Sequence, residues 1–81
     1  MNHRITFYTR ERCSLCDKAK AVVDRVRATH DFELEVLDLD KEASPDKLAA
    51  YTHEVPVVEL DGRKIMKYEV DEARLVRLLS L

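Results

Sequence analysis

The chain of 81 residues has no tryptophan, two phenylalanines, three tyrosines and a single glycine. Its 14 lysines and arginines are scattered among 16 aspartates and glutamates, without a polybasic run. Nucleic-acid-binding surfaces cluster basic residues, and those that bind single strands usually add aromatic side chains on which bases stack. This scarcity argues against a protein that binds nucleic acid.

Long apolar stretches are also missing. No segment approaches the roughly 18 consecutive apolar residues that suggest a membrane-spanning helix. The first residues, Met1-Asn2-His3-Arg4, run straight into a strand pattern and lack the apolar core and cleavage site of a signal peptide. We therefore expect a cytoplasmic protein with no membrane partner.

Composition and length point to a small globular protein. Hydrophobic residues make up 46% of the chain and charged residues 37%, with a formal net charge of −2, which is typical of a soluble fold. The length is near the lower limit for a core without cross-links or metal. No linker, repeat or low-complexity segment is present, so we expect one monomeric domain over residues 1–81.

The first half of the chain has the pattern of a strand, a helix and a second strand. The β-formers of Arg4–Tyr8 predict a strand, and the polar Thr9–Arg12 predict a loop. Apolar residues then recur at helical spacing over Leu15–Val26. After a break at Thr29–Asp31, apolar and charged residues alternate over Phe32–Leu37, as in a half-buried strand. Such a βαβ unit is normally right-handed.

The second half predicts a helix, a hairpin and a final helix. Ser44–Tyr51 begins with a capping serine followed by a proline, which is a helix start. Two strand patterns, Val55–Leu60 and Arg63–Lys67, flank Asp61-Gly62, the signal of a tight hairpin. From about Val70 the spacing is helical again. The order βαβαββα predicts an α/β fold with a four-stranded mixed sheet flanked by helices.

Cys13 and Cys16 lie three positions apart, between the first strand and the first helix. The start of a helix leaves unpaired backbone N–H groups and the positive end of the helix dipole, and both favour a thiolate over a thiol. We therefore expect Cys13 to ionise more readily than a free thiol. Arg10 and Arg12 act in the same direction, whereas Glu11 and Asp17 oppose it.

The spacing of the two cysteines supplies a second chemical step. One helical turn after Cys13, the thiol of Cys16 can attack a mixed disulfide on Cys13 and release the reduced partner. In a reducing cytosol, two cysteines so close together are more often catalytic or metal-binding than a structural staple. The motif therefore indicates thiol–disulfide exchange.

Other uses of the pair need more ligands than one chain supplies. A structural zinc site normally has four protein ligands, and a single C-x-x-C provides two. His3, His30 and His53 form no second paired motif, so we expect no metal in one chain. An iron–sulfur cluster would have to be shared between two chains. The remaining alternative is a vestigial or regulatory pair.

The order of elements, the tetrapeptide Cys13-Ser14-Leu15-Cys16 and a proline at the start of the third strand resemble the thioredoxin fold. The compact length is similar to that of the glutaredoxins, and the resemblance spans essentially the whole chain. Tyr8-Thr9-Arg10 resembles the segment before the glutaredoxin active site, which implies that Arg10 contacts the substrate. Val55-Pro56 resembles the family's Val-Pro pair, which implies a cis bond before Pro56, opposite the cysteines.

The chain departs from the dithiol glutaredoxins in two places. Ser14-Leu15 stands where they have Pro-Tyr, and the segment 66–71 stands where they have Gly-Gly followed by Asp. Gly62 is the only glycine, so the close backbone approach that builds a glutathione site is missing, and Asp71 is at best a displaced equivalent. This combination is most similar to small C-x-L-C glutaredoxin-like domains.

These patterns predict a glutaredoxin-like dithiol oxidoreductase. Cys13 would attack a disulfide in a protein or a small thiol compound, and Cys16 would resolve the mixed disulfide. The intermediate would be held beside Val55 and Pro56, where backbone groups of Val55 are left to pair with an extended partner. No organic cofactor is needed, and electrons would come from glutathione or a thioredoxin-type reductase. The alternative is a redox-sensing or non-catalytic binding module of the same fold.

Overall fold

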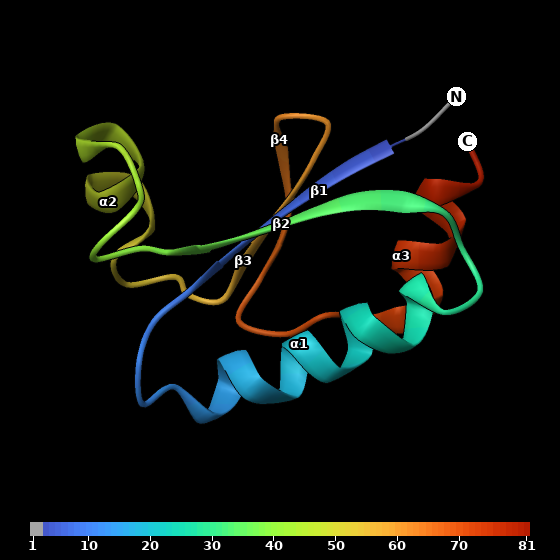
Figure 1. Cartoon of the computed structure of the whole chain (residues 1–81), viewed down its shortest axis with the longest axis horizontal. Helices are drawn as coiled ribbons and strands as arrows, with labels where there is room; N and C mark the ends of the chain where they lie inside the picture. Colours follow the sequence, from blue (N-terminus) through green and yellow to red (C-terminus); the bar gives the residue numbers. More distant parts are fainter. Residues whose placement is uncertain (1–2) are drawn as a thin grey trace.

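The computed structural model describes residues 3–81 and contains helices and strands in the order expected from the sequence (Figure 1). They are β1 (His3–Thr9), α1 (Ser14–Arg27), β2 (Phe32–Asp38), α2 (Pro45–Tyr51), β3 (Val57–Leu60), β4 (Arg63–Lys67) and α3 (Glu72–Leu79). Within this range, no helix combines the length and the apolar character needed to cross a bilayer.

The four strands form one mixed sheet in the order β2-β1-β3-β4. β1 pairs in parallel with β2 and antiparallel with β3, and β3 pairs antiparallel with β4. Parallel neighbours need a long crossover, which α1 supplies, whereas a tight turn is enough to join β3 to β4. The structure therefore confirms the βαβαββα topology and the four-stranded mixed sheet.

The turn between β3 and β4 uses the chain's only glycine. Asp61 and Gly62 both have positive φ, at 51° and 87°, which suits the left-handed positions of a tight hairpin. The Asp61 carboxylate is hydrogen-bonded to Nδ1 of His3 at 2.7 Å and accepts the Arg4 N–H at 2.8 Å. These two bonds lower the pKa of the Asp61 carboxyl and tie the turn to the start of β1.

The sheet separates two apolar clusters, because successive side chains of a strand point to opposite faces. Ile5 and Phe7 of β1 pack with α1 and α3, which lie on the same side of the sheet in Figure 1. The residues of this larger core are Ile5, Phe7, Ala19, Val23, Val26, Phe32, Val58, Met66 and Leu75. On the other face, Tyr8 packs with Leu39, Tyr51 and Val57.

β1 is one residue longer than predicted at each end, so it includes Thr9, and β2 extends one residue further, to Asp38. Two other details of the strands also differ from the sequence prediction. β3 begins at Val57 and not at Val55, because Pro56 has no N–H with which to join a strand ladder. Val36 continues the alternation of β2 but is 41% exposed, since β2 is an edge strand of the sheet. The alternating pattern therefore predicted the strand correctly, but it predicted more burial of the apolar side chains than the structure has.

A buried carboxylate holds α2 on the second face of the sheet. Glu59 of β3 is 5% exposed and accepts hydrogen bonds from the Tyr51 hydroxyl at 2.7 Å and from Lys47 Nζ at 2.6 Å. The ring of Tyr51 also meets that of Tyr8 edge to face, with centroids 5.2 Å apart. Because α2 ends one residue before Thr52, this anchor positions the segment that leads into Val55-Pro56.

The pKa values of this cluster make the fold sensitive to alkali. Burial, followed by the Glu59 carboxylate, raises the pKa of Tyr8 and Tyr51 above the ordinary 10.0. The hydrogen bond to Glu59 raises that of Lys47 above 10.5. Below those ordinary values the three groups are protonated in both the folded and the unfolded chain. As the pH rises above them, the groups lose their protons in the unfolded chain before they do so in the folded protein. The free energy of unfolding therefore falls as the pH rises.

We therefore expect the free energy of unfolding to fall as the pH rises beyond about 10. Urea unfolding followed by circular dichroism, at a series of pH values on both sides of that point, measures the decline. Tyr51→Phe should make the decline shallower and should lower the stability near neutral pH by about 1 kcal/mol through the lost hydrogen bond. An equally steep decline in that variant would show that Tyr51 does not contribute to it.

Candidate active site

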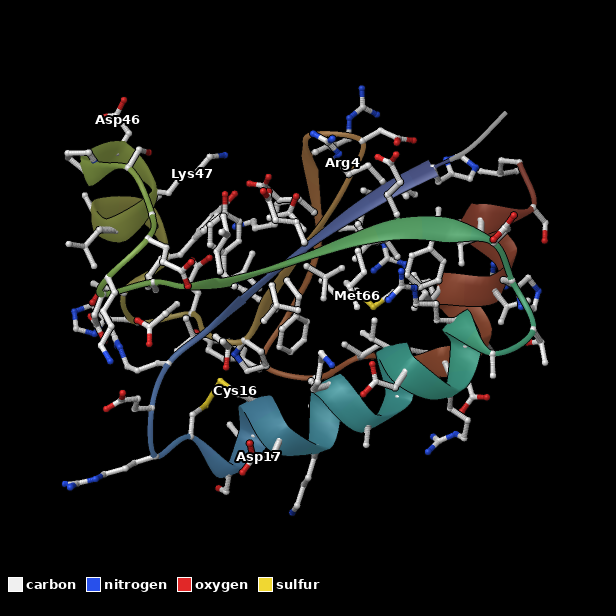
Figure 2. The ribbon with its side chains drawn as sticks, viewed as in Figure 1. Arg4, Cys16, Asp17, Asp46, Lys47 and Met66 are labelled. Carbon is white, nitrogen blue, oxygen red and sulfur yellow. A yellow bond between two sulfur atoms is a disulfide. The ribbon has the colours of Figure 1, made fainter. Side chains whose placement is uncertain are left out.

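The two cysteines form a disulfide at the start of α1, with Cα atoms 5.1 Å apart (Figure 2). Cys13 ends the loop that follows β1, and Cys16 lies in the first turn of the helix. Their burial differs: Cys13 is partly exposed, whereas only 1% of Cys16 is accessible. Of the two linked residues, Cys13 is therefore the one nearer to solvent.

Cys13 is itself the N-cap of α1. Its backbone is extended, with φ −119° and ψ 98°, and its Sγ accepts the Cys16 N–H at 3.1 Å. Its carbonyl accepts the Asp17 N–H, also at 3.1 Å. In most helices a side-chain oxygen of Ser, Thr, Asp or Asn satisfies this amide. Here the first turn directs an amide hydrogen at sulfur, which stabilises a thiolate more than a thiol.

The residue before Cys13 turns the chain into the helix. Arg12 has φ 57°, a left-handed conformation that is uncommon outside glycine and costs an ordinary residue roughly 1–2 kcal/mol. Its side chain is exposed and forms no hydrogen bond or ion pair with any residue in the range 3–81. The left-handed conformation of Arg12 therefore turns the backbone into α1 and does not place the arginine side chain in a contact.

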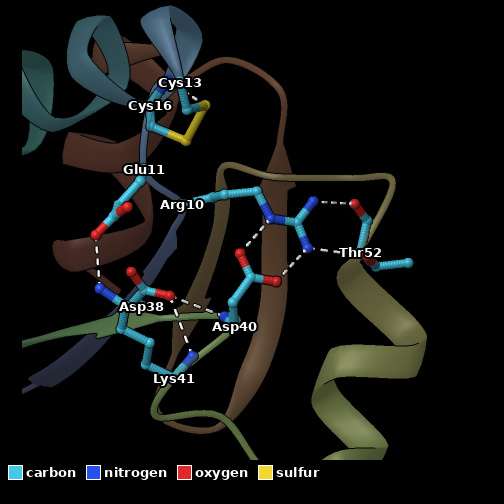
Figure 3. A network of polar contacts seen from close by, with 8 residues as sticks. All are labelled: Arg10, Glu11, Cys13, Cys16, Asp38, Asp40, Lys41 and Thr52. Atoms are coloured by element: carbon cyan, nitrogen blue, oxygen red, sulfur yellow. Dashed lines mark hydrogen bonds and ion pairs between the residues drawn. A yellow bond between two sulfur atoms is a disulfide. The ribbon is translucent and has the colours of Figure 1, made fainter.

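Arg10 is held in a clasp with two other segments (Figure 3). Its Nε and Nη2 donate to the two carboxylate oxygens of Asp40 at 2.8 and 2.9 Å. Its Nη1 and Nη2 donate to the carbonyl and the hydroxyl of Thr52 at 2.8 and 2.9 Å. The hydrogen bonds from Arg10 lower the pKa of the Asp40 carboxyl. Asp40 follows β2 and Thr52 caps α2, so the clasp joins three parts of the fold.

The clasp bears directly on the predicted role of Arg10. A guanidinium has five N–H donors, and the bonds to Asp40 and Thr52 use four of them. A second tie runs beside it, from Lys41 Nζ to Glu11 at 2.6 Å. Substrate contact by Arg10 stays a prediction, and the structure adds a positioning role for the loop that bears Cys13. Sequence reasoning missed Asp40 and Thr52, because nothing in the sequence pairs them with Arg10.

The Val55–Pro56 peptide bond is cis, as the family resemblance implied. Tyr8 of β1 pairs with Val57 in the antiparallel register, so Val55-Pro56 lies at the same end of the sheet as the Cys13 loop. Val55 is partly exposed, and its backbone makes no hydrogen bond within residues 3–81. These groups are available to an extended partner, although their use by a substrate stays a prediction.

The segment between β4 and α3 lies next to Pro56. The Tyr68 N–H donates to the Pro56 carbonyl at 2.8 Å, and Tyr68 itself has φ 67°. α3 begins at Glu72, two residues later than the spacing predicted, because the Asp71 carboxylate caps it by accepting the Arg74 N–H at 3.0 Å. Asp71, which the sequence analysis compared with the glutaredoxin aspartate, thus serves as the cap of α3.

A groove of about 240 Å³ lies between the first half of α1 and this segment. Its walls include Leu15, the residue before Cys16, and Tyr68. Sequence reasoning placed neither side chain at the site, since Leu15 reads as part of the apolar stripe of the helix and Tyr68 reads as a core or rim residue. Among the residues the structure describes, no group of three or more His, Cys, Asp or Glu side chains comes together as a metal site would require.

Replacing Arg10 with lysine should open the clasp, because a single ammonium cannot bridge Asp40 and both oxygens of Thr52. We expect the melting temperature to fall by several degrees and the rate of disulfide exchange to fall to the same extent with anionic and neutral disulfides. Arg12→Lys, at a neighbouring arginine without a partner, should leave the melting temperature unchanged. A loss confined to anionic disulfides would instead identify Arg10 as a substrate contact.

Comparison with known proteins agrees with this geometry. The chain is 36% identical over 75 residues to a glutaredoxin-like protein of Dictyostelium discoideum, covering 88% of this chain and 69% of that protein. An X. campestris protein of known structure superposes with a TM-score of 0.71 at 28% identity, over 94% of this chain and 95% of the other. A thioredoxin from Halobacterium salinarum, at 21% identity, has a TM-score of 0.70 over 98% of this chain and 73% of its own, which shows the thioredoxin fold. The family model Glutaredoxin-like domain (DUF836) matches residues 4–80, and the chain belongs to that family.

Proposed function

We propose that this protein is a dithiol–disulfide oxidoreductase in which Cys13 attacks and Cys16 resolves. The observation that supports the proposal most strongly is the unequal burial of two linked sulfurs at a helix start. A substrate can approach Cys13, whereas Cys16 is shielded from everything except the sulfur of Cys13. This asymmetry is what the two successive steps require.

In the first step, the Cys13 thiolate attacks one sulfur of the substrate disulfide. A bond forms between Cys13 Sγ and that sulfur while the substrate's own S–S bond breaks, and the other substrate sulfur leaves as a thiolate that takes up a proton. In the second step, the Cys16 thiolate attacks Cys13 Sγ and expels the remaining substrate sulfur. Two electrons have passed to the substrate, and the protein holds the Cys13–Cys16 disulfide that the structure contains.

The helix start favours the first step and the final release of Cys13. The Cys16 N–H that lies 3.1 Å from Cys13 Sγ stabilises the attacking thiolate of Cys13. During regeneration an external reductant attacks the more exposed Cys13 sulfur, and Cys16 leaves as a thiolate. A second thiol of the reductant then attacks this mixed disulfide and releases Cys13 as a thiolate, which the same bond stabilises. We assign no organic cofactor, because the electrons enter and leave through sulfur alone.

The substrate that fits this site best is an extended segment of a protein disulfide. The unpaired backbone groups of Val55 can receive the main chain of such a segment beside the cysteines. Glutathione is less well suited, since the Asp71 carboxylate is engaged as a helix cap and the chain has no glycine between Gly62 and its end. We therefore propose that a thioredoxin-type dithiol system, in a reducing compartment such as the cytosol, regenerates the protein.

Cys16→Ser should trap a covalent complex through Cys13, because the only thiol placed to resolve it has been removed. Cys13→Ser should form no complex, and its reduction of a small aromatic disulfide should fall to the uncatalysed rate. Non-reducing electrophoresis and mass spectrometry detect the complex, and absorbance follows the turnover. If both variants reduce the disulfide as fast as the parent, the assigned roles are wrong. Capture of a partner by the oxidised parent without any turnover would identify a thiol sensor instead.

The electron donor can be tested on the oxidised protein directly. We expect thioredoxin with its reductase and NADPH to reduce the Cys13–Cys16 disulfide at least ten times faster than glutathione at equal thiol concentration, an order-of-magnitude expectation for a site that lacks specific glutathione contacts. Alkylation of the freed thiols followed by mass spectrometry measures the rate. Equal rates would show that the missing glycines do not disfavour glutathione.

A further inference from the structure

We propose that the groove between α1 and the segment Tyr68–Val70 is a specificity site, which receives a bulky apolar side chain next to the reactive cysteine of an extended protein substrate. The inference rests on the proposed disulfide exchange and names the substrate class for it. The side chains that line the groove are Leu15, Lys18, Ala19, Val22, Tyr68, Glu69 and Val70.

Each wall of the groove includes a residue that is linked to the candidate active site. Leu15 on one wall lies between Cys13 and Cys16 in the first turn of α1. Tyr68 on the other wall is tied to the cis-proline segment, because its N–H donates to the Pro56 carbonyl at 2.8 Å. A substrate segment bound beside Val55 with its sulfur on Cys13 would therefore place a neighbouring side chain at the groove.

Exposed apolar surface is concentrated at this place. Within residues 3–81 the exposed large hydrophobic side chains are Leu15, Val36, Leu48, Tyr68 and Leu81. Leu15 and Tyr68, at 44% and 43%, face the same groove, whereas Val36 lies on β2 and Leu48 on α2. Apolar side chains that converge beside a reactive group, rather than being scattered singly, mark a binding site.

The backbone at Tyr68 supports a functional reason for the tyrosine. Its φ of 67° lies in the left-handed region, which a bulky side chain adopts only under constraint and a glycine adopts freely. The hydrogen bond to Pro56 provides the constraint. Strained residues of this kind gather at functional sites, and here the strain keeps a large ring at the edge of the groove.

The size and charge of the groove select an apolar side chain over glutathione. Its volume of about 240 Å³ is below the roughly 300–1,000 Å³ of pockets that enclose a whole small molecule. Lys18 is its only cationic lining residue, and Glu69 is its only anionic one. The balanced charges give no net attraction for the carboxylates of glutathione, whereas Ala19, Val22 and Val70 complete an apolar lining.

Two synthetic heptapeptides test the proposal. Each carries one cysteine as a mixed disulfide with thionitrobenzoate, and they differ only in the residue after the cysteine, which is leucine or serine. Attack by Cys13 on the peptide sulfur forms the Cys13–peptide disulfide and releases coloured thionitrobenzoate, so absorbance gives the rate. The reduced Cys16→Ser protein confines the measurement to this first step.

We expect the leucine peptide to react about ten times faster than the serine peptide, the discrimination typical of one apolar side chain in a pocket. Tyr68→Gly should bring the ratio of the two rates close to one. A general change in the reactivity of Cys13 affects both peptides equally and therefore leaves the ratio of their rates unchanged. Glycine readily adopts the positive φ of position 68, so this variant should keep the local backbone conformation. Leu15→Ser alters the opposite wall and should lower the ratio in the same way.

Val36→Ser is the matched control, because Val36 is similarly exposed but lies on the edge strand β2. It should keep the tenfold preference. A parent ratio near one, or an equal loss of preference in Val36→Ser and Tyr68→Gly, would overturn the specificity site while leaving the proposed exchange intact. If neither peptide releases thionitrobenzoate from the parent or from Cys16→Ser, the proposed function fails, and the inference fails with it.

Discussion

The hydrogen bond from the Cys16 N–H to Cys13 Sγ is the contact on which the rest of the site depends. Because of this bond Cys13 is the N-cap of α1. One residue therefore both begins the helix and carries one of the two linked sulfurs. The start of the helix directs a backbone N–H at Cys13 Sγ, and the packing of α1 against the sheet buries Cys16. The difference in accessibility between the two cysteines thus follows from the place where α1 begins.

The remainder of the fold brings other segments to that helix start. The Arg10 clasp with Asp40 and Thr52 fixes the loop that delivers Cys13, and the Glu59 cluster fixes α2, which leads to the cis-proline. The β4–α3 segment is joined to Pro56 through the Tyr68 N–H. The site is therefore held together by three connections between segments that are distant in the sequence. A substitution that removes any of these connections would alter the geometry around the disulfide, although it replaces neither cysteine.

Prediction from sequence worked where a residue's role is local. The period of Leu15–Val26 identified α1, Asp61-Gly62 identified the hairpin, and Ser44-Pro45 identified the start of α2, because each pattern is a property of a few neighbouring residues. It failed where a partner is distant in the chain. The partners of Arg10 come from positions 30 and 42 residues away, and no pattern in the sequence marks such pairs.

The sequence by itself determined the order of elements, the family and the cysteine pair at a helix start, since periodicity, turn chemistry and motif spacing act over short distances. Tertiary structure alone decided that Arg10 is held by a carboxylate and a threonine, and that Leu15 and Tyr68 face one groove. These features arise when strands β1 and β3 pair and helices dock, because packing chooses which distant side chains meet and which stay exposed.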